Sequence, residues 1–555
     1  MSIPWARWRP KLVECLPQYS RTDFTHDLLA GVTVALVALP LALAFAIASG
    51  VPPQAGLYTA IVGGLLAALL GGSRLQVSGP TGAFVVIVAG IIQRHGMSGL
   101  LMVTMMAGVI LVLLAVTGLG NAVQFIPRPV VVGFTNGIAL LIASTQVTHF
   151  LGLEMSNPSE FFERMGLIAS RLSTWNPAAV ALAASALALI LLIPRWKPQV
   201  PGSIVALVVG TLAAWAFELH VPTVGSMFGE IPRQLPGLSI PSFRADLVMP
   251  LIPSALTVAF LAALESLLSA VVADSLSGDR HNSNAELLAQ GVANIVVPMV
   301  GGMPVTGAIA RTATNFRAGA RTPVASIIHA LALLAIVLLA APLASQVPLA
   351  VLAAVLFVVA WNMGEWREIG AILRLELADK AVWFVTFALT VMADLTVAVA
   401  VGLALAGLLY IYRVTETTSV AVVTPEYLAA GRPHTLTDKH VPSYVNIIRI
   451  HGPFLFGMTD KLVDVTTDLS AFAPIVVLRL RNMTAIDATG LHALQELSDR
   501  LRRSGRTLLL CGARHQPARL LEQTDFIDHV GRDNILPHVD AALTRAAAIH
   551  DRNQP

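Results

Sequence analysis

Long apolar runs separated by short polar stretches dominate the chain between residues 28 and 393. A helix needs about 20 apolar residues to cross the hydrocarbon core of a membrane. When the combined length of the runs is divided by about 20 residues, it predicts roughly 12 to 14 membrane-spanning segments, some of them short. The runs without a charged residue are 28–73, 75–93, 96–127, 129–148, 172–194, 198–217, 247–264, 287–310, 322–364 and 381–393.

Two of these segments open on the same triplet, Thr-Gly-Ala, at matching places in the two halves of the chain. Residues 81–83 follow Pro80, and residues 306–308 follow Pro304. Each segment runs for about 14 residues, to Arg94 and to Arg317, which is too short to cross a membrane alone. Paired, interrupted segments of this kind indicate half-helices of an inverted repeat.

The starts of the two half-helices are candidates for an anion site. Thr81 and Thr306 are good helix N-caps, and the prolines before them suit a helix start. Helix N-termini carry partial positive charge, which inside a membrane would favour an anion. Chance recurrence of three common membrane residues is the alternative explanation of the triplets.

Composition supports a polytopic membrane protein. Of 555 residues, 55% are hydrophobic and 12% are charged, and the mean hydropathy is +0.72. Soluble domains carry about twice that charged fraction. The net charge of +3 does not indicate nucleic-acid binding, and Cys15 and Cys511 fit neither a metal site nor a disulfide framework. We expect no cleavable signal peptide, because the stretch before residue 28 is polar and basic.

The distribution of basic residues predicts the topology. With 14 segments and the N-terminus inside, about 15 basic residues fall inside and about 5 outside, as the positive-inside rule requires. Both termini are then cytoplasmic, in a cell (inner) membrane. The predicted parts are a cytosolic N-terminus (1–26), a transport domain (27–413, with repeats at about 27–220 and 248–413), a linker (414–440), a soluble α/β domain (441–546) and a tail (547–555).

The soluble domain is predicted from alternating and buried-strand patterns. Strands are expected at 444–451, 475–480 and 507–511, with a strand-like stretch at 420–423 in the linker. Amphipathic helices are expected at 490–503 and 517–523.

Several short motifs follow one another along the chain, at residues 39–45, 56–58, 78–81, 265–269, 273–274, 284–287, 290–291, 302–311 and 487–491. The order and spacing of these motifs resemble the SulP anion transporter family, called solute carrier family 26 in animals, and residues 487–491 resemble its C-terminal STAS domain. The resemblance implies 14 segments in two inverted repeats of seven, a core domain that moves against a gate domain, and a homodimer.

Glu265 is the first candidate site residue, because an ionised carboxylate in an apolar run is expensive and marks function by default. Burial disfavours the charged form of a carboxyl group, so Glu265 could take up and release a proton. With Ser269, one turn further, it could instead coordinate Na⁺; a sodium-dependent bicarbonate branch of the family has Asp and Thr at these places. A structural hydrogen bond is the alternative role.

Arg311, in the second half-helix, is the candidate anion ligand, because a guanidinium binds carboxylate or sulfate through two hydrogen bonds. The family places an arginine at this position beside the anion. A salt bridge to Glu265 without ligand contact is the alternative, and the pair could exchange partners when substrate binds. Arg317 and Arg321 are expected to be cytoplasmic anchors.

The resemblance also assigns Phe45 to the wall of the pocket. Leu41 departs from the glutamine of many relatives, which puts one polar substrate contact in doubt. The predicted substrate-binding set is Phe45, Pro80, Thr81, Gly82, Glu265, Ser269, Thr306, Gly307, Ala310 and Arg311, with Glu265 as the proton- or cation-coupling residue.

Other polar residues receive lesser roles. Thr489 matches a phosphorylatable serine of bacterial anti-sigma-factor antagonists, and we expect it to be the N-cap of its helix with a regulatory role as the alternative. Asp394 is assigned no role. Solvated loop or cap positions are expected for Asp274, Asp279, Arg280, His281 and Glu286.

The sequence thus predicts a secondary active transporter of small anions, with no cofactor and no enzyme motif such as a P-loop, HExxH or nucleophile elbow. Because the cell interior is negative, uptake needs a cation, and proton symport through Glu265 is the simplest account. The motifs around Glu265 and Arg311 most resemble transporters of C4-dicarboxylates such as fumarate and succinate. Bicarbonate or sulfate symport with H⁺ or Na⁺, and an uncoupled anion or chloride channel, remain open; a membrane sensor is disfavoured. A cytosolic regulator could act on the STAS-like domain.

Overall fold

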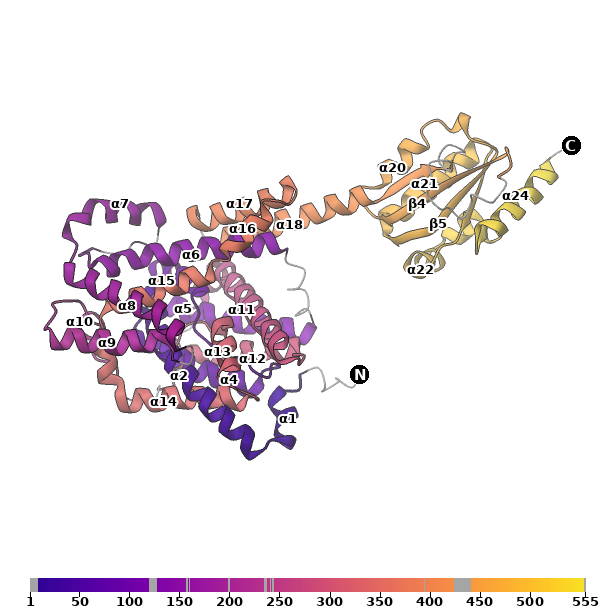
Figure 1. The fold of residues 1–555 in the computed structure, drawn as a ribbon. Coiled ribbons are helices and arrows are strands. Elements are labelled where there is room, and N and C mark those ends of the chain that lie inside the picture. Colours follow the sequence, from indigo (N-terminus) through magenta and orange to yellow (C-terminus); the bar gives the residue numbers. More distant parts are fainter. Residues whose placement is uncertain are drawn as a thin grey trace. The chain divides into compact units, whose positions relative to one another are not determined.

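The computed structural model describes residues 8–118, 127–155, 158, 160–197, 200–233, 237–239, 241, 244–393, 395–423 and 441–553. The chain forms two compact units, Met1–Ala406 and Gly407–Pro555, which are treated separately below. The first is helical and the second is an α/β unit (Figure 1). Asp394, most of the predicted linker and the chain ends lie outside the described residues.

Nine helices of the described chain are long and apolar enough to cross a membrane, and Gly202–Ala216 is a shorter apolar helix. The count of fourteen segments stays a prediction, because several expected segments are helices too short to be recognised by length. The helices of the first unit are α1 (Lys11–Cys15), α2 (Arg21–Ala48), α3 (Pro53–Tyr58), α4 (Gly64–Leu70), α5 (Ala83–Thr117), α6 (Arg128–Leu151), α7 (Phe161–Arg171), α8 (Pro177–Trp196), α9 (Gly202–Ala216), α10 (Val224–Phe228), α11 (Val248–Ser277), α12 (Ser283–Val296), α13 (Ile309–Arg317), α14 (Val324–Ser345), α15 (Leu349–Met363), α16 (Trp366–Ile372), α17 (Leu377–Met392) and α18 (Leu395–Thr417), the last of which continues into the second unit.

The two predicted half-helices are present. Helix α13 ends at Arg317, as expected. Helix α5 is longer than expected, but its backbone leaves the helical conformation at Gly96, with φ 65° and ψ −171°. Residues 83–95 therefore form a short helix, and a second helix follows the kink. Glycine allows this break because it has no side chain to clash at positive φ.

A two-stranded ribbon joins the starts of the half-helices. Strand β1 (Ser78–Gly79) pairs with β2 (Thr306–Gly307) in antiparallel register, Ser78 with Gly307 and Gly79 with Thr306. Each strand leads into its half-helix, so the ribbon brings the starts of the two short helices together. The sequence patterns did not predict this pairing, because two residues are too few for an alternation to be visible.

The expected threonine caps are wrong. The N-cap residues of α5 and α13 are Gly82 and Ala308, and neither caps its helix through a side chain. Thr489 does not cap its helix either: Asp487 is the N-cap of α21 and accepts a hydrogen bond from the Gly490 amide at 2.8 Å. In each case the threonine lies one or two residues from the cap, a shift that sequence alone resolves poorly.

Small residues allow close packing of the helices. A Cβ atom on Gly108 of α5 would lie 2.7 Å from the Gly291 carbonyl oxygen of α12, and one on Gly291 would lie 2.9 Å from that of Gly108. Backbones can approach this closely only where side chains are absent, which is how membrane helices pack without a hydrophobic driving force. This pairing with α12 holds the second helix of α5, which follows the kink at Gly96, near the second half of the chain.

The second unit contains a five-stranded sheet of order β3-β4-β5-β6-β7. Strand β3 is antiparallel to β4, and the remaining pairs are parallel. The predicted strands and helices are present with shifted ends, whereas β7, α20, α23 and α24 were not predicted. The elements are β3 (Ser419–Val422), β4 (Val445–Phe454), α20 (Thr459–Val465), β5 (Ile475–Ile486), α21 (Ala488–Arg503), β6 (Thr507–Cys511), α22 (His515–Gln523), α23 (Phe526–Val530), β7 (Ile535–Leu536) and α24 (Val539–Asn553).

Candidate functional site

Glu265 contacts the start of the first half-helix. The Thr81 hydroxyl donates a hydrogen bond of 2.7 Å to Oε2 of Glu265, whose side chain is half-buried on α11. Thr81 is thus used to hold a carboxylate, and this replaces its predicted role as a cap. The bond joins two predicted site residues that lie far apart in the sequence.

Arg311 reaches the same place from the second half-helix. It is only 2% exposed, and its guanidinium donates a hydrogen bond of 2.5 Å to the Pro80 carbonyl oxygen. A Cβ atom on Gly79 would lie 2.6 Å from the guanidinium, so the chain at Gly79 leaves room for this side chain. Arg311 and Glu265 therefore hold two consecutive residues, Pro80 and Thr81.

The predicted alternative of a direct Arg311–Glu265 ion pair is not what the structure shows. Both residues are described, and no pair of their nitrogen and oxygen atoms lies within 4.0 Å. The cation and the carboxyl group bond instead to two consecutive residues, Pro80 and Thr81. An anion can contact the guanidinium there without first breaking a salt bridge.

Thr306 and Gly307 are held by α11. The Thr306 hydroxyl donates to the Ala262 carbonyl oxygen at 2.9 Å and shares a 2.8 Å hydrogen bond with Ser266, whose hydroxyl accepts from the Gly307 amide. Thr306 and Ser266 are both fully buried. These bonds fix β2 to α11 and give Thr306 a positioning role. Ser266 has the same role, although no sequence pattern singled it out.

Ser269 is buried one turn from Glu265. Its hydroxyl shares a 2.9 Å hydrogen bond with Thr312 of α13, and Thr312 accepts from the Val77 amide at 3.1 Å. Ser269 therefore connects α11 to the second half-helix. For it to coordinate Na⁺ beside Glu265, its hydroxyl would have to leave or share this bond.

Phe45 lies against the start of the first half-helix. A Cβ atom on Gly82 would lie 3.4 Å from the Phe45 ring, 3.2 Å from Ile142 and 3.3 Å from Met363. Phe45 is 4% exposed, and Ala310, just before Arg311, is exposed. The structure thus brings Phe45 to the predicted site, while its contact with a substrate stays a prediction.

Glu286 is not in a solvated loop, and this expectation is wrong. It is 1% exposed on α12 and accepts hydrogen bonds from the Gly72 amide at 3.0 Å, from Gln76 at 2.7 Å and from Gln290 at 3.0 Å. Gln290 also donates to the hydroxyl of Ser78 in β1. A sequence signal existed, since Glu286, Gln290 and Asn294 recur every four residues on one helix face.

Asn294 and Thr59 hold the loop before β2. Asn294 donates to the Val305 carbonyl oxygen at 2.8 Å and accepts from the Val305 amide at 3.0 Å. Thr59 accepts from the Met303 amide at 2.8 Å. Thr59 opens a π-helical turn, Thr59–Gly63, a geometry that is frequent at functional sites. Buried polar side chains thus fix both strands of the ribbon.

His329 is a further buried polar residue near the site. It is 1% exposed on α14, and neither ring nitrogen has a hydrogen-bond partner within the described part of the chain. Its ring lies within electrostatic reach of Arg311. No sequence pattern singled out His329, because a single histidine in an apolar run carries no spacing signal.

Of the residues predicted to lie on the cytosolic side, Asp279 accepts a hydrogen bond from Lys11 at 3.0 Å, and His281 pairs with Asp274 at 2.6 Å. Arg321 pairs with Asp23 at 3.0 Å, and its amide donates to the buried Asp27. Asp274 lies in the last turn of α11, and Asp279 and His281 lie in the loop that follows it, as expected; the anchoring role of Arg321 stays a prediction. Arg317 is exposed at the end of α13.

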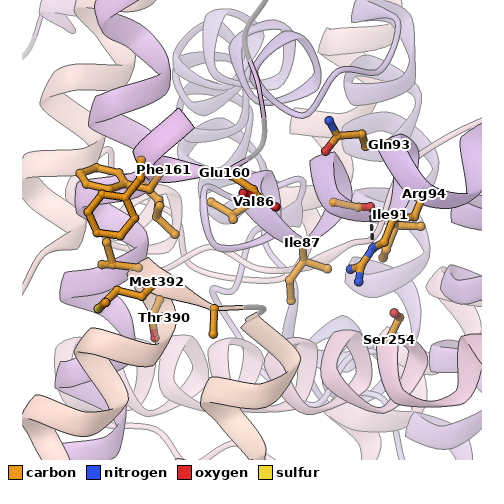
Figure 2. A pocket seen from close by; sticks show the side chains of 15 residues that line it. Val86, Ile87, Ile91, Gln93, Arg94, Glu160, Phe161, Ser254, Thr390 and Met392 are labelled. Atoms are coloured by element: carbon orange, nitrogen blue, oxygen red, sulfur yellow. Dashed lines mark hydrogen bonds between the residues drawn. The ribbon is translucent and has the colours of Figure 1, made fainter. Parts of the chain in front are cut away.

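A cavity of about 420 Å³ lies along the first half-helix (Figure 2). In Figure 2, Phe161 and Met392 stand on one side of it and Arg94 and Gln93 on the other. A second cavity, of about 290 Å³, shares Val86 and Gln93 with the first and reaches Arg164. None of the predicted site residues lines either cavity. The polar geometry around Pro80 and Thr81, and not cavity size, therefore defines the candidate site.

Comparison with known proteins identifies this architecture. A family model described as the sulfate permease family matches residues 24–386, and one for the STAS domain matches residues 437–542. The chain belongs to the sulfate permease family. It is an anion transporter of that family, SulP, with a C-terminal STAS domain, and the predicted family and helical membrane architecture are confirmed at this level.

Sulfate permease relatives match over nearly the whole chain. The Bacillus subtilis (strain 168) protein named "Putative sulfate transporter YvdB" is 41% identical over 525 residues, which are 94% of this chain and 98% of that one. The "Bicarbonate transporter BicA" of Synechocystis is 32% identical over 94% of each chain. These names concern sulfate and bicarbonate, so the likeness to dicarboxylate transporters stays a prediction.

Solved structures of the family share the fold. The transmembrane domain of a cyanobacterial BicA is 32% identical, covers 70% of this chain and 98% of its own, and has a TM-score of 0.62. Murine Slc26a9 in the inward-facing state covers 97% of this chain and 94% of its own with a TM-score of 0.86. At 19% identity, this second likeness bears on the fold alone.

Proposed function

We propose that the protein is a secondary active symporter that takes up a small oxyanion together with a proton. The anion binds at the Pro80–Thr81 segment, between the starts of the two half-helices. The observation that carries this proposal is that Glu265 and Arg311, from the other half of the chain, hydrogen-bond to these two consecutive residues. One position thus has a fixed cation on one side and a titratable carboxyl group on the other.

Arg311 supplies the attraction for the anion. Its guanidinium is buried, and one nitrogen is held by the Pro80 carbonyl oxygen, which orients the planar group. The remaining N–H donors can bind two oxygens of a carboxylate or sulfate. The partial positive charge at the starts of α5 and α13 adds to this attraction.

Glu265 couples the anion to a proton. A unit negative charge about 5 Å from an ionised carboxylate costs about 3 kcal/mol at an effective dielectric constant of 20, or roughly a hundredfold in affinity. Protonation of Glu265 removes this repulsion, so anion and proton bind more favourably together than separately. Protonation also frees the Thr81 hydroxyl from the carboxylate, and it can then donate to the substrate.

Sulfate is the first substrate to test, because a relative that spans nearly the whole chain is named for it. Bicarbonate follows from the name of BicA. Fumarate and succinate remain candidates from the motifs around Glu265 and Arg311. All of them present two or more oxygens to one guanidinium, so the site chemistry proposed here serves each.

We also propose how the protein assembles and how it is oriented in the membrane. The protein lies in the cell membrane as a homodimer with both termini in the cytoplasm, and a core domain carries the site past a gate domain. The short helices and kinked backbone around the ribbon support alternating access about a fixed site. Domain limits follow the sequence prediction, with transport by residues 27–413 and regulation through the STAS domain, where Thr489 is exposed on the first turn of α21.

The test is uptake into proteoliposomes of labelled sulfate, bicarbonate and fumarate under imposed pH or Na⁺ gradients. We expect accumulation of one of them driven by a pH gradient. Glu265→Gln should abolish the accumulation while exchange of the anion down its own gradient persists. Glu154→Gln, at an exposed position, is the matched control. Accumulation that survives in Glu265→Gln, or that only a Na⁺ gradient drives, would overturn proton coupling.

The same variant tests the channel alternative. Uncoupled conduction requires no proton on Glu265, so currents that are independent of the pH gradient and unchanged in Glu265→Gln would favour a channel. A dependence of the reversal potential on pH would instead support the symporter.

A further inference from the structure

The α/β unit contains a small cavity whose walls carry three arginines. Its volume is about 100 Å³. The arginines are Arg479 and Arg481 of β5 and Arg514, just before α22. The rest of the lining is Cys511, Gly512, Pro537, His538, Val539 and Asp540.

The cavity lies where ligands bind in parallel sheets, at the carboxyl ends of the strands. Arg479 is in register with Cys511, the last residue of β6, and Cys511 is in register with Leu536, the last residue of β7. Helix α24 begins at Val539, immediately after β7. The start of this helix adds partial positive charge at the cavity, although the Ala541 amide already donates a hydrogen bond of 3.1 Å to Nδ1 of His538.

The loop after β6 closes one side of the cavity. Gly512 has φ +75°, and its amide donates a 3.0 Å hydrogen bond to the Leu536 carbonyl oxygen. A Cβ atom at this position would lie 3.3 Å from Cβ of Arg481. Glycine therefore allows the loop to pass close to β5 and leads directly to Arg514.

The charge of the cavity is unusual for a partly buried position. Arg479 is 7% exposed and stands in register beside Arg449 of β4, and like charges on neighbouring strands repel. The acidic group in the lining is Asp540, with an oxygen 4.0 Å from the His538 ring. Arg449, Arg479 and Asp540 have further polar partners. Among the described residues that line the cavity, three are arginines and one is an aspartate.

Cys511 does not supply a counter-charge. It is 2% exposed, and burial raises the pKa of its thiol to about 11, although Arg479 opposes the shift. The thiol is therefore neutral at physiological pH. It contributes volume and a weak donor to the cavity wall and leaves the anionic role to a ligand.

We propose that this cavity binds one tetrahedral oxyanion, phosphate or sulfate, between Arg479, Arg481 and Arg514. Guanidinium groups match the oxygens of such an ion through paired hydrogen bonds. The cavity volume of about 100 Å³ leaves room for a single oxyanion.

The test uses the full-length protein in detergent and hydrogen–deuterium exchange read from peptides covering residues 507–516 and 535–545. Sodium phosphate and sodium sulfate are titrated at constant ionic strength against sodium chloride. We expect saturable slowing of exchange in both peptides with phosphate or sulfate and none with chloride. Absence of slowing with either oxyanion would refute the site.

Variants test whether the slowing of exchange by phosphate or sulfate depends on the arginines. Arg479→Gln and Arg514→Gln should each raise the oxyanion concentration at half-saturation roughly tenfold or more, since each removes charge-assisted hydrogen bonds. Arg514 is exposed, so its variant tests the site even if Arg479→Gln does not fold. Arg503→Gln, an exposed arginine outside the cavity, is the matched control. Equal weakening in all three variants would mean diffuse charge screening and would overturn the proposal.

Two further arms separate the ligand source and the transport site. ATP or GTP that protects at lower concentration than inorganic phosphate would assign the site to a phosphate group carried by a nucleotide, whereas equal or weaker protection assigns it to the free ion. Arg311→Gln should leave the protection of both peptides unchanged. Loss of protection in Arg311→Gln would place the responsible ion in the membrane unit and contradict the proposal.

Discussion

Replacing Gly79 with alanine tests whether the position of Arg311 determines anion affinity. A Cβ atom at Gly79 would lie 2.6 Å from the Arg311 guanidinium and 3.3 Å from Cα of Ala60. The closer atom is the end of a flexible side chain, so it can move. The Cα atom of Ala60 belongs to the backbone and moves less readily, but the new Cβ atom would approach it less closely. The substitution should therefore displace Arg311 before it unfolds the site.

The expected loss of anion affinity follows from the distance between the new Cβ atom and the guanidinium. Nonbonded heavy atoms are comfortable at about 3.5 Å, so the guanidinium must move by roughly 0.9 Å. That shift breaks or strains its hydrogen bond to Pro80, and a hydrogen bond to a charged group is worth about 1.5–3 kcal/mol. We expect anion affinity to fall roughly 10- to 100-fold. Gly79 also has φ +156°, so alanine should cost about 1 kcal/mol of stability in addition.

The assay is the KM for uptake in proteoliposomes, measured beside the melting temperature in detergent. Gly166→Ala is the matched control, because a Cβ atom at Gly166 of α7 would meet nothing within 4 Å. The control should keep the KM and the melting temperature of the parent protein. A Gly79→Ala protein that melts within a few degrees of the parent and transports with an unchanged KM would refute the assigned role of Arg311.

Three other predictions concern stability. Glu286→Ala removes the acceptor of three buried hydrogen bonds and should lower the free energy of unfolding by about 3 kcal/mol. Its melting temperature should therefore lie below that of Glu154→Ala, and equal melting temperatures would contradict the structural role of Glu286. His329→Leu removes two buried nitrogens that have no partner in the described chain, so the melting temperature should hold or rise, and a marked drop would show that the ring has an unseen partner such as water. Hydrogen bonds from Ser470 hold the pKa of Asp468 below its ordinary value of 3.8, so the stability that Asp468 gives is present above that pH and lost as pH falls. Asp468→Asn should therefore melt below the parent at pH 7, the difference should shrink as pH falls below 3.8, and a constant difference would contradict this.

Much of the membrane unit could be predicted from sequence because the relevant signals are local. Apolar run length defines helices, and the short runs after Pro80 and Pro304 predicted half-helices that the structure contains. An isolated carboxylate such as Glu265 is visible because its cost depends on its immediate neighbours. Motif order was enough to place the chain in its family and to predict the STAS domain.

Partners of polar side chains could not be predicted in this way. Thr81 was expected to cap a helix, yet it bonds to Glu265, 184 residues away. Glu286 was assigned to a loop, yet it binds Gly72 and Gln76, more than 200 residues earlier. Sequence patterns report periodicity within one element, whereas these hydrogen bonds depend on which elements the fold places together.

The sequence by itself therefore determined the class of the protein: the membrane helices, the two interrupted segments, the isolated carboxyl group and the arginine, and the soluble domain. The tertiary structure decided the site. Only the antiparallel pairing of Ser78–Gly79 with Thr306–Gly307 brings Arg311 to Pro80 and Glu265 to Thr81. The physical reason is that a buried charge must find its partners in space, and nearly the whole transport domain has to fold before those partners are adjacent.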